Sequence, residues 1–174
     1  MKEYGLLGLT LGHSFSQKFF TEKFNREGID ARYLNFEIPD ISCLRDILFE
    51  HPYLEGLNCT IPYKETLLPY LDEITPEAQE IGAVNVVKIH RDPNFTGGRC
   101  MDGIRLTGYN SDIIGFTESI SPFLKPHHRK ALILGTGGAT KAIKVGLEKL
   151  GIATLRDLIS WFPRKYDDRR QAKR

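Results

Sequence analysis

Short apolar segments alternate with segments of helical periodicity along almost the whole chain, and this alternation limits the fold more than any other feature. Short apolar runs bounded by turn residues are typical of strands, whereas apolar residues spaced by three and four are typical of helices. Strands alternating with helices predict an α/β fold around a mostly parallel sheet. The expected strands are 4–9, 32–38, 54–61, 83–90, 99–109 and 131–134, and the expected helices are 16–26, 41–49, 65–71, 76–81, 111–123 and 138–150.

The order of these elements divides the chain into three parts. Residues 1–124 are expected to form one α/β domain, residues 125–152 an incomplete Rossmann-like unit, and residues 153–174 a basic tail. The total of 174 residues fits one domain plus part of a second. A complete dinucleotide domain needs several βαβ units, and the residues after Gly151 show no strand pattern. We therefore expect one strand and one helix of that domain, with no second strand.

Charge and cysteine content narrow the classes of function. The chain has 24 basic and 22 acidic residues, and the tail alone has seven basic and three acidic ones, which leaves the tail at +4 and the remainder at −2. The body thus gives no reason to expect a nucleic-acid partner, and the tail a weak one. No apolar run approaches the ~20 residues that span a bilayer. Three cysteines without metal or redox spacing (Cys43, Cys59 and Cys100) predict a cytoplasmic protein with reduced thiols and no metal site.

A glycine-rich turn lies between the expected strand 131–134 and the expected helix 138–150. Glycines between a strand and a helix allow the backbone to approach a pyrophosphate, which the helix N-terminus then binds. A P-loop does not fit, because Thr140 precedes Lys141 where a glycine is required. A purely structural tight turn stays open as an alternative. The candidate cofactor-binding residues are Gly135, Thr136, Gly137, Gly138 and Ala139.

Polar residues follow or interrupt several expected strands. Ser14 and Ser16 stand where a strand leads into a helix, a position that suits either a bound carboxylate or ordinary helix capping. Lys64 follows the third strand, where polar groups are well placed for a ligand, although a solvated surface lysine is the simpler interpretation. Asn85 interrupts an apolar strand and needs partners if it is buried. Asp112 fits a cap of the next helix as well as a site.

Five motifs occur in a fixed order along residues 1 to about 152. They are Gly12-His13-Ser14-x-Ser16, Asn58-x-Thr60-x-Pro62-Tyr63-Lys64, Gly82-Ala83-Val84-Asn85, Gly108-Tyr109-Asn110-Ser111-Asp112 and Gly135-x-Gly137-Gly138-Ala139. This series resembles the shikimate dehydrogenases, and five motifs in order are far more specific than any one of them. The resemblance implies a substrate-binding α/β domain followed by an NADP-binding Rossmann domain, and the reduction of 3-dehydroshikimate to shikimate by NADPH.

The same resemblance implies roles for individual residues. Ser14 and Ser16 would hold the substrate carboxylate, and Thr60, Asn85 and Asp112 would hydrogen-bond the ring hydroxyls. The proton-transfer residue would be Lys64, with Asp112 beside it. A ketone that receives a hydride also needs a proton on its oxygen, which a partly buried lysine can supply.

Two positions depart from the family pattern. Ser111 stands where the family commonly has threonine, which keeps the hydroxyl. Ile113 stands where the family commonly has glycine, and its larger side chain either narrows the approach to the site or packs within the helix. The incomplete cofactor unit also leaves apolar faces uncovered, which favours association into a homo-oligomer.

The tail has a different resemblance. Phe162-Pro163-x-x-Tyr166-x-Asp168-Arg169, preceded by a short helical pattern, is similar to the start of the wedge domain of RecG-type DNA helicases. The match covers about twenty residues and includes no motor domain. Two alternatives to a dehydrogenase therefore stay open. The first is a fragment that binds shikimate without turnover. The second is a fragment that contacts nucleic acid through the tail. For the tail itself, a basic C-terminus without function is the simpler interpretation.

Overall fold

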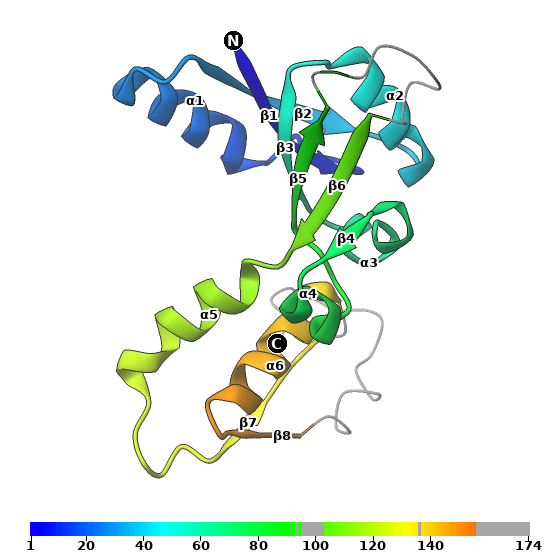
Figure 1. Ribbon diagram of the computed structural model, residues 1–174. Helices are drawn as coiled ribbons and strands as arrows, with labels where there is room; N and C mark the ends of the chain where they lie inside the picture. The colour runs from blue at the N-terminus through cyan, green and yellow to red at the C-terminus, as the bar shows by residue number, and fades with distance from the viewer. Residues whose placement is uncertain (93, 95–102, 136, 156–174) are drawn as a thin grey trace, which may run out of the picture.

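The computed structural model describes residues 1–92, 94, 103–135 and 137–155. Its central feature is a six-stranded sheet in the order β2-β1-β3-β5-β6-β4 (Figure 1). β1 pairs in parallel with β2 and β3, and β4 in parallel with β6, whereas β5 runs antiparallel to both of its neighbours. The expected α/β fold with a mainly parallel sheet is confirmed. The strands are β1 (Lys2–Gly8), β2 (Ala31–Glu37), β3 (Leu54–Cys59), β4 (Glu73–Ile74), β5 (Val86–Arg91) and β6 (Ile104–Tyr109).

Helices cover both faces of this sheet, with α1 on one face and α2 on the other (Figure 1). Successive side chains of a strand point to opposite faces, so Leu6 of β1 packs with Phe24 of α1 while Leu7 packs with Leu48 of α2. The helices of this part are α1 (Phe15–Glu27), α2 (Leu44–Glu50), α3 (Tyr63–Thr66), α4 (Pro76–Ile81) and α5 (Asp112–Ile120), with short 3₁₀ segments η1 (Ile41–Cys43), η2 (Leu68–Tyr70) and η3 (Ser121–Phe123).

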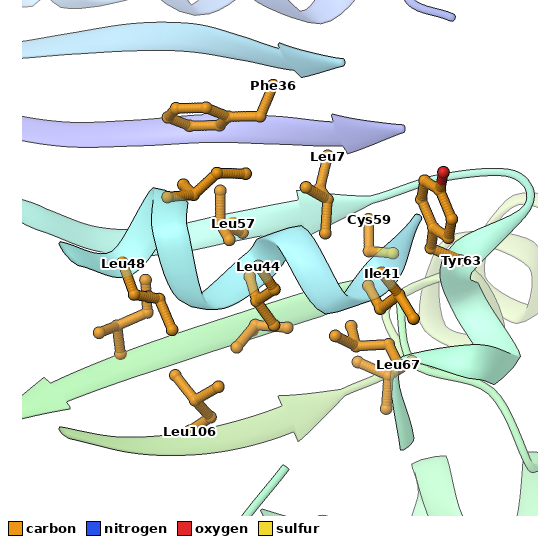
Figure 2. Packing of buried hydrophobic residues seen from close by; sticks show 14 of the residues in the cluster. Leu7, Phe36, Ile41, Leu44, Leu48, Leu57, Cys59, Tyr63, Leu67 and Leu106 are labelled. Atoms are coloured by element: carbon orange, nitrogen blue, oxygen red, sulfur yellow. The ribbon is translucent and has the colours of Figure 1, made fainter. Parts of the chain in front are cut away.

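The largest hydrophobic core lies between the sheet and α2. Leu44 and Leu48 of α2 point toward Leu7 and Leu57 of the sheet, and Leu67 closes the end of the core near α3 (Figure 2). Burying a leucine side chain contributes roughly 1.5–3 kcal/mol, so this cluster fixes the strands whose ends carry the polar motifs. Within the described ranges, no helix has both the length and the apolar character needed to cross a membrane.

A second, smaller unit follows α5. It consists of β7 (Lys130–Leu132), α6 (Gly138–Lys149) and β8 (Ala153–Leu155), with β7 and β8 paired in parallel. The expectation that no second strand follows Gly151 is therefore wrong, and residues 153–155 lie with this unit and not with the tail. Gly151, at φ 73°, turns the chain back after α6, and buried Ile152 leads into the strand. Three residues are too few for a recognisable strand pattern.

The connection between β5 and β6 is described only in part, and the tail after residue 155 is not described. β6 begins at Ile104, and Asp92 N donates to Gly103 O at 2.9 Å across the base of the connection from β5. The expected start of that strand at 99, the residue Cys100 and the tail after 155 lie outside the described residues.

The buried carboxylate of Glu3 should make folding stability depend on pH. Glu3 is 4% exposed and binds Arg32 and His51, with a distance of 2.8 Å to His51 Nδ1. Burial alone would raise the pKa of Glu3, but its hydrogen bonds and opposite charges outweigh that effect and lower the pKa below its usual 4.5. The group therefore stabilises the fold above about pH 4.5, and this contribution disappears as the pH falls through the lowered pKa.

We predict that Glu3→Gln lowers the free energy of unfolding at pH 7 by roughly 1–3 kcal/mol, because a charge-assisted network is weakened. Urea denaturation at pH 7 and at pH 3 measures this change, and the deficit should shrink at the lower pH. Glu55→Gln is the matched control, because Glu55 forms an exposed ion pair with Lys2 and should change stability little. An equal deficit at both pH values would contradict the assignment.

Candidate active site

The polar motifs converge at one edge of the sheet because of strand direction. β1, β3 and β6 end at this edge, and the antiparallel β5 begins there. The register places Asn58 opposite Val86, and Val86 opposite Tyr109. The segments that follow β3 and β6, and the segment that precedes β5, therefore come together although they are far apart in the sequence.

Lys64 and Asp112 form the centre of this edge. Lys64 Nζ lies 2.5 Å from Asp112 Oδ2, and the side chains are 15% and 29% exposed, respectively. The other carboxylate oxygen, Oδ1, accepts a hydrogen bond of 2.7 Å from Asn85 Nδ2. A partly buried ammonium is thus held by a carboxylate whose second oxygen is already bound, which restricts both side chains to one arrangement.

Asn85 organises the loop between β6 and α5. It is 8% exposed, and its Oδ1 accepts from Ser111 N at 2.8 Å while its Nδ2 donates to Asp112. Asn110 completes the loop, because its Oδ1 accepts from Asp112 N at 3.0 Å and its Nδ2 donates to Ala83 O at 2.9 Å. The predicted need of a buried Asn85 for partners is met. The capping bond at the start of α5 comes from Asn110, so Asp112 keeps its carboxylate for Lys64 and Asn85.

Ser14 and Ser16 lie at the start of α1, beyond the end of β1. Ser14 Oγ accepts from Ser16 N at 3.2 Å, so Ser14 acts as the helix cap that the sequence allowed as an alternative. Both serines are half-buried, and the helix of 13 residues begins directly behind them. Among the described residues, the two serine side chains make no hydrogen bond to the Lys64–Asp112 pair.

Thr60 lies between these two groups of residues. Its backbone N–H donates to Leu7 O at 2.9 Å, and its carbonyl accepts from Tyr63 N at 2.9 Å as the chain enters α3. A side chain at Gly8 would come within 2.9 Å of Thr60 Cγ2. Glycine at this position therefore lets β1 approach Thr60 closely. Asn58, which Tyr33 Oη contacts at 2.7 Å, also lies here. It stands in the second motif and interrupts an apolar strand, but we did not predict it as a site residue.

The glycine turn lies against the helix that carries Lys64. A Cβ added to Gly138 would lie 3.2 Å from Lys64 Cβ, and Lys141 Nζ is 2.6 Å from Glu65 Oε2. Gly135 has φ 134°, a conformation that favours glycine, and a Cβ at Gly137 would meet nothing within 4 Å. A positive-φ glycine and an open approach to the N-terminus of α6 fit a bound pyrophosphate. Ala139 lies in the first turn of α6, and Thr136 is outside the described residues.

The two departures from the family pattern have simple structural outcomes. Ser111 Oγ lies 3.1 Å from Asn85 Nδ2, so the hydroxyl keeps a place in the network. Ile113 is buried in a cluster with Ile81 and Ala142. Its side chain therefore packs between α5 and α6.

We predict that Asn85→Ala lowers the free energy of unfolding by about 2 kcal/mol, because Ser111 N and Asp112 Oδ1 lose a buried partner. Ser111→Ala should cost less than about 1 kcal/mol, since Asn85 keeps its bonds to the Ser111 backbone and to Asp112. Thermal and urea unfolding of both variants measure the difference. Equal losses would mean that the Asn85 amide does not hold the loop.

Comparison with known proteins identifies relatives for most of the chain. Residues 6–87 match the family model of the shikimate dehydrogenase substrate binding domain, and residues 133–174 match that of the RecG wedge domain. The wedge match therefore begins within the glycine turn and overlaps α6 and β8. A shikimate dehydrogenase (NADP(+)) of Pyrococcus abyssi is 37% identical over 150 residues, which cover 86% of this chain and 52% of that protein. One from Bacillus cytotoxicus is 36% identical over 152 residues, with 86% and 50% covered.

Solved structures give the same result. The shikimate dehydrogenase of Aquifex aeolicus superposes with a TM-score of 0.73 at 34% identity, covering 88% of this chain and 54% of that one. The Thermus thermophilus enzyme in complex with NADP(H) and shikimate superposes with a TM-score of 0.70 at 31% identity, with 88% and 54% covered. This chain spans about half the length of the curated relatives that it matches.

Proposed function

We propose that residues 1 to about 152 bind shikimate and serve the NADPH-dependent reduction of 3-dehydroshikimate, as their similarity to the shikimate dehydrogenases and to the substrate binding domain of that family suggests. The observation that carries the proposal is the Lys64–Asp112 pair at 2.5 Å, held by Asn85 at the edge of the sheet. Residues 48 positions apart come together there with the groups that this chemistry needs. The Thermus thermophilus relative has been solved with both NADP(H) and shikimate.

In the proposed complex, Ser14 and Ser16 bind the carboxylate of the substrate. The N-terminus of α1 lies directly behind them, and its free N–H groups and partial positive charge favour an anion at this position. Thr60, Asn85 and Asp112 bind the ring hydroxyls. These groups surround Lys64, so a ring bound by its carboxylate and hydroxyls would present its carbonyl to the ammonium.

Lys64 is the proposed proton-transfer residue. When a hydride reaches the carbonyl carbon, negative charge develops on the oxygen, and a proton from Lys64 Nζ neutralises it. Asp112 holds the ammonium in place through Oδ2, and Asn85 fixes Asp112 through Oδ1. In the direction of shikimate oxidation, the neutral amine of Lys64 accepts the proton of the hydroxyl.

NADPH, when bound, supplies the hydride. We propose that Gly135, Thr136, Gly137, Gly138 and Ala139 hold its pyrophosphate at the start of α6. The parallel pairing of β7 and β8 around α6 supports a Rossmann-type unit, and the close approach of Gly138 to Lys64, where an added Cβ would lie 3.2 Å from Lys64 Cβ, supports a cofactor site beside the substrate. We accordingly divide the chain into a substrate domain up to about residue 124, a cofactor unit from 125 to 155, and the tail.

We predict that the chain reduces NADP⁺ when shikimate is supplied, and that Lys64→Ala lowers the rate by at least about 100-fold. Absorbance of the reduced nicotinamide measures turnover. Lys88→Ala is the control, because Lys88 is an exposed lysine of strand β5 that is not part of the Lys64–Asp112–Asn85 cluster. Equal rates for Lys64→Ala and the control would contradict the assigned role of Lys64.

A second candidate function is shikimate binding without turnover. The observation that favours it is that the proposed substrate contacts all lie within residues 14–112, apart from the proposed cofactor-binding residues 135–139. Calorimetry separates the two functions, because binding without turnover gives heat with shikimate and no absorbance change with NADP⁺. Under either function the variant with both Ser14→Ala and Ser16→Ala should bind shikimate at least about tenfold more weakly. No heat from the unaltered chain at millimolar shikimate would refute both functions.

We also propose a cytoplasmic location and self-association. Cys43 and Cys59 are free thiols, which supports a reducing compartment. Leu132 and Leu134 in the cofactor unit are more than half exposed, and such apolar side chains favour contact with a second copy.

A further inference from the structure

The first domain and the β7–α6–β8 unit meet along α6, largely through hydrophobic packing. Ala142 and Val145 of α6 lie in a buried cluster with residues of α4 and α5. The free energy of apolar burial depends on the area removed from water and has no preferred direction. This packing therefore attaches α6 to the first domain but defines less well where the helix lies along its own axis.

Two ion pairs give this contact a direction. Lys141 Nζ lies 2.6 Å from Glu65 Oε2 near the start of α6, and Lys149 Nζ lies 3.2 Å from Glu80 Oε2 at its end. Among the described residues, these two pairs are the polar side-chain contacts between the first domain and the β7–α6–β8 unit. The first pair lies beside the candidate site, because Glu65 directly follows Lys64 in α3.

We infer that Glu65 and Lys141 are positioning residues, whose ion pair fixes the glycine turn at the distance from Lys64 that the transfer of a hydride and a proton requires. The inference rests on the function proposed above. It adds two residues that neither the motifs nor the proposed ligand contacts include.

Glu65 belongs to a firmly held part of the first domain. The carbonyl of Lys64 accepts from Val84 N at 2.7 Å, which ties the backbone of α3 to the segment that leads into β5. Tyr63 is buried, and its Oη donates to Ile38 O at 2.5 Å. The proposed proton donor thus has a defined place in the first domain, and Glu65 relates the start of α6 to that place.

The start of α6 explains why Lys141 needs such a partner. Lys141 is the fourth residue of the helix, near the end where the backbone dipole is positive and a cation is unfavourable by itself. The Glu65 carboxylate offsets that charge. At the same end, a Cβ added to Gly138 would lie 3.2 Å from Lys64 Cβ and 3.3 Å from Ala83 Cβ. Because the approach is this close, a shift of α6 away from α3 would directly lengthen the distance from the glycine turn to Lys64.

A direct contact of Lys141 with the cofactor is the competing explanation. In that case the lysine binds the pyrophosphate, and Glu65 competes for its charge. The two explanations differ in the effect of losing Glu65. A positioning pair predicts weaker cofactor binding, because the competent arrangement of the turn becomes less populated. A direct contact predicts equal or tighter binding, because Lys141 is released.

The test measures the dissociation constants of NADP⁺ and of shikimate separately by calorimetry. Glu65→Gln and Lys141→Met each remove one charge of the pair, and Lys141→Arg keeps both charges. Glu80→Gln is the matched control, because it breaks the ion pair at the other end of α6, whose side chains are similarly exposed.

We expect Glu65→Gln and Lys141→Met each to weaken NADP⁺ binding about threefold, as suits a partly exposed ion pair, and the double variant to lose no more than either one. Shikimate binding in these variants should change by less than about 1.5-fold, as should NADP⁺ binding in Lys141→Arg and Glu80→Gln.

Three results would overturn the inference alone. They are unchanged or tighter NADP⁺ binding in Glu65→Gln, additive losses in the double variant, and an equal loss in Glu80→Gln or for shikimate. Absence of NADP⁺ binding by the unaltered chain would instead overturn the proposed cofactor site, and the inference with it.

Discussion

The direction of one strand decides where the candidate site lies. β5 runs against β3 and β6, so its first residue, Val86, lies at the edge where those two strands end. Asn85 directly precedes that residue, so its carbonyl accepts from Cys59 N at the end of β3 and its side chain reaches the loop after β6. If β5 ran parallel to its neighbours, its start would lie at the opposite edge, some 17–20 Å away for a strand of this length. The hydrogen bonds of Asn85 to Ser111 and Asp112 depend on this reversal.

Local sequence patterns predicted the elements better than their arrangement. The end of α1 was predictable because Gly28 provides the left-handed conformation at its C-terminus, and the structure has φ 65° there. Turn residues after β5 indicated a hairpin or a loop, but the antiparallel pairing of β5 with β3 was not predictable, because the order of strands depends on contacts that are distant in sequence. β8 escaped prediction for another reason, since three residues carry too little periodicity. Most helices and strands can thus be recognised from local sequence patterns, whereas the sheet topology and very short strands cannot.

The candidate site was predicted largely from the resemblance and only in part from the residues themselves. Asn85 had a physical signal of its own, a polar amide in an apolar strand. From local sequence alone, Lys64 was interpreted as a surface lysine and Asp112 as a helix cap. No spacing rule pairs residues that lie 48 positions apart. Tyr33 gave no polar signal at all, because in an alternating strand it reads as an ordinary core residue. The hydrogen bond from its hydroxyl to Asn58 Oδ1 is visible only in the structure.

The packing of α6 has a consequence for how this chain folds. Ala142 and Val145 of α6 are buried against Ile81, Ala83 and Ile113 of the first domain, and the small β7–β8 pair covers little of the helix. Among the described residues, the hydrophobic cluster that holds α6 beside the glycine turn is shared with α4 and α5. The conformation of the glycine turn therefore depends on packing against α4 and α5. We expect the first domain and the β7–α6–β8 unit to unfold together as one cooperative unit. Local unfolding of α5 would release both the Asp112 carboxylate and the glycine turn, and the two would be lost together.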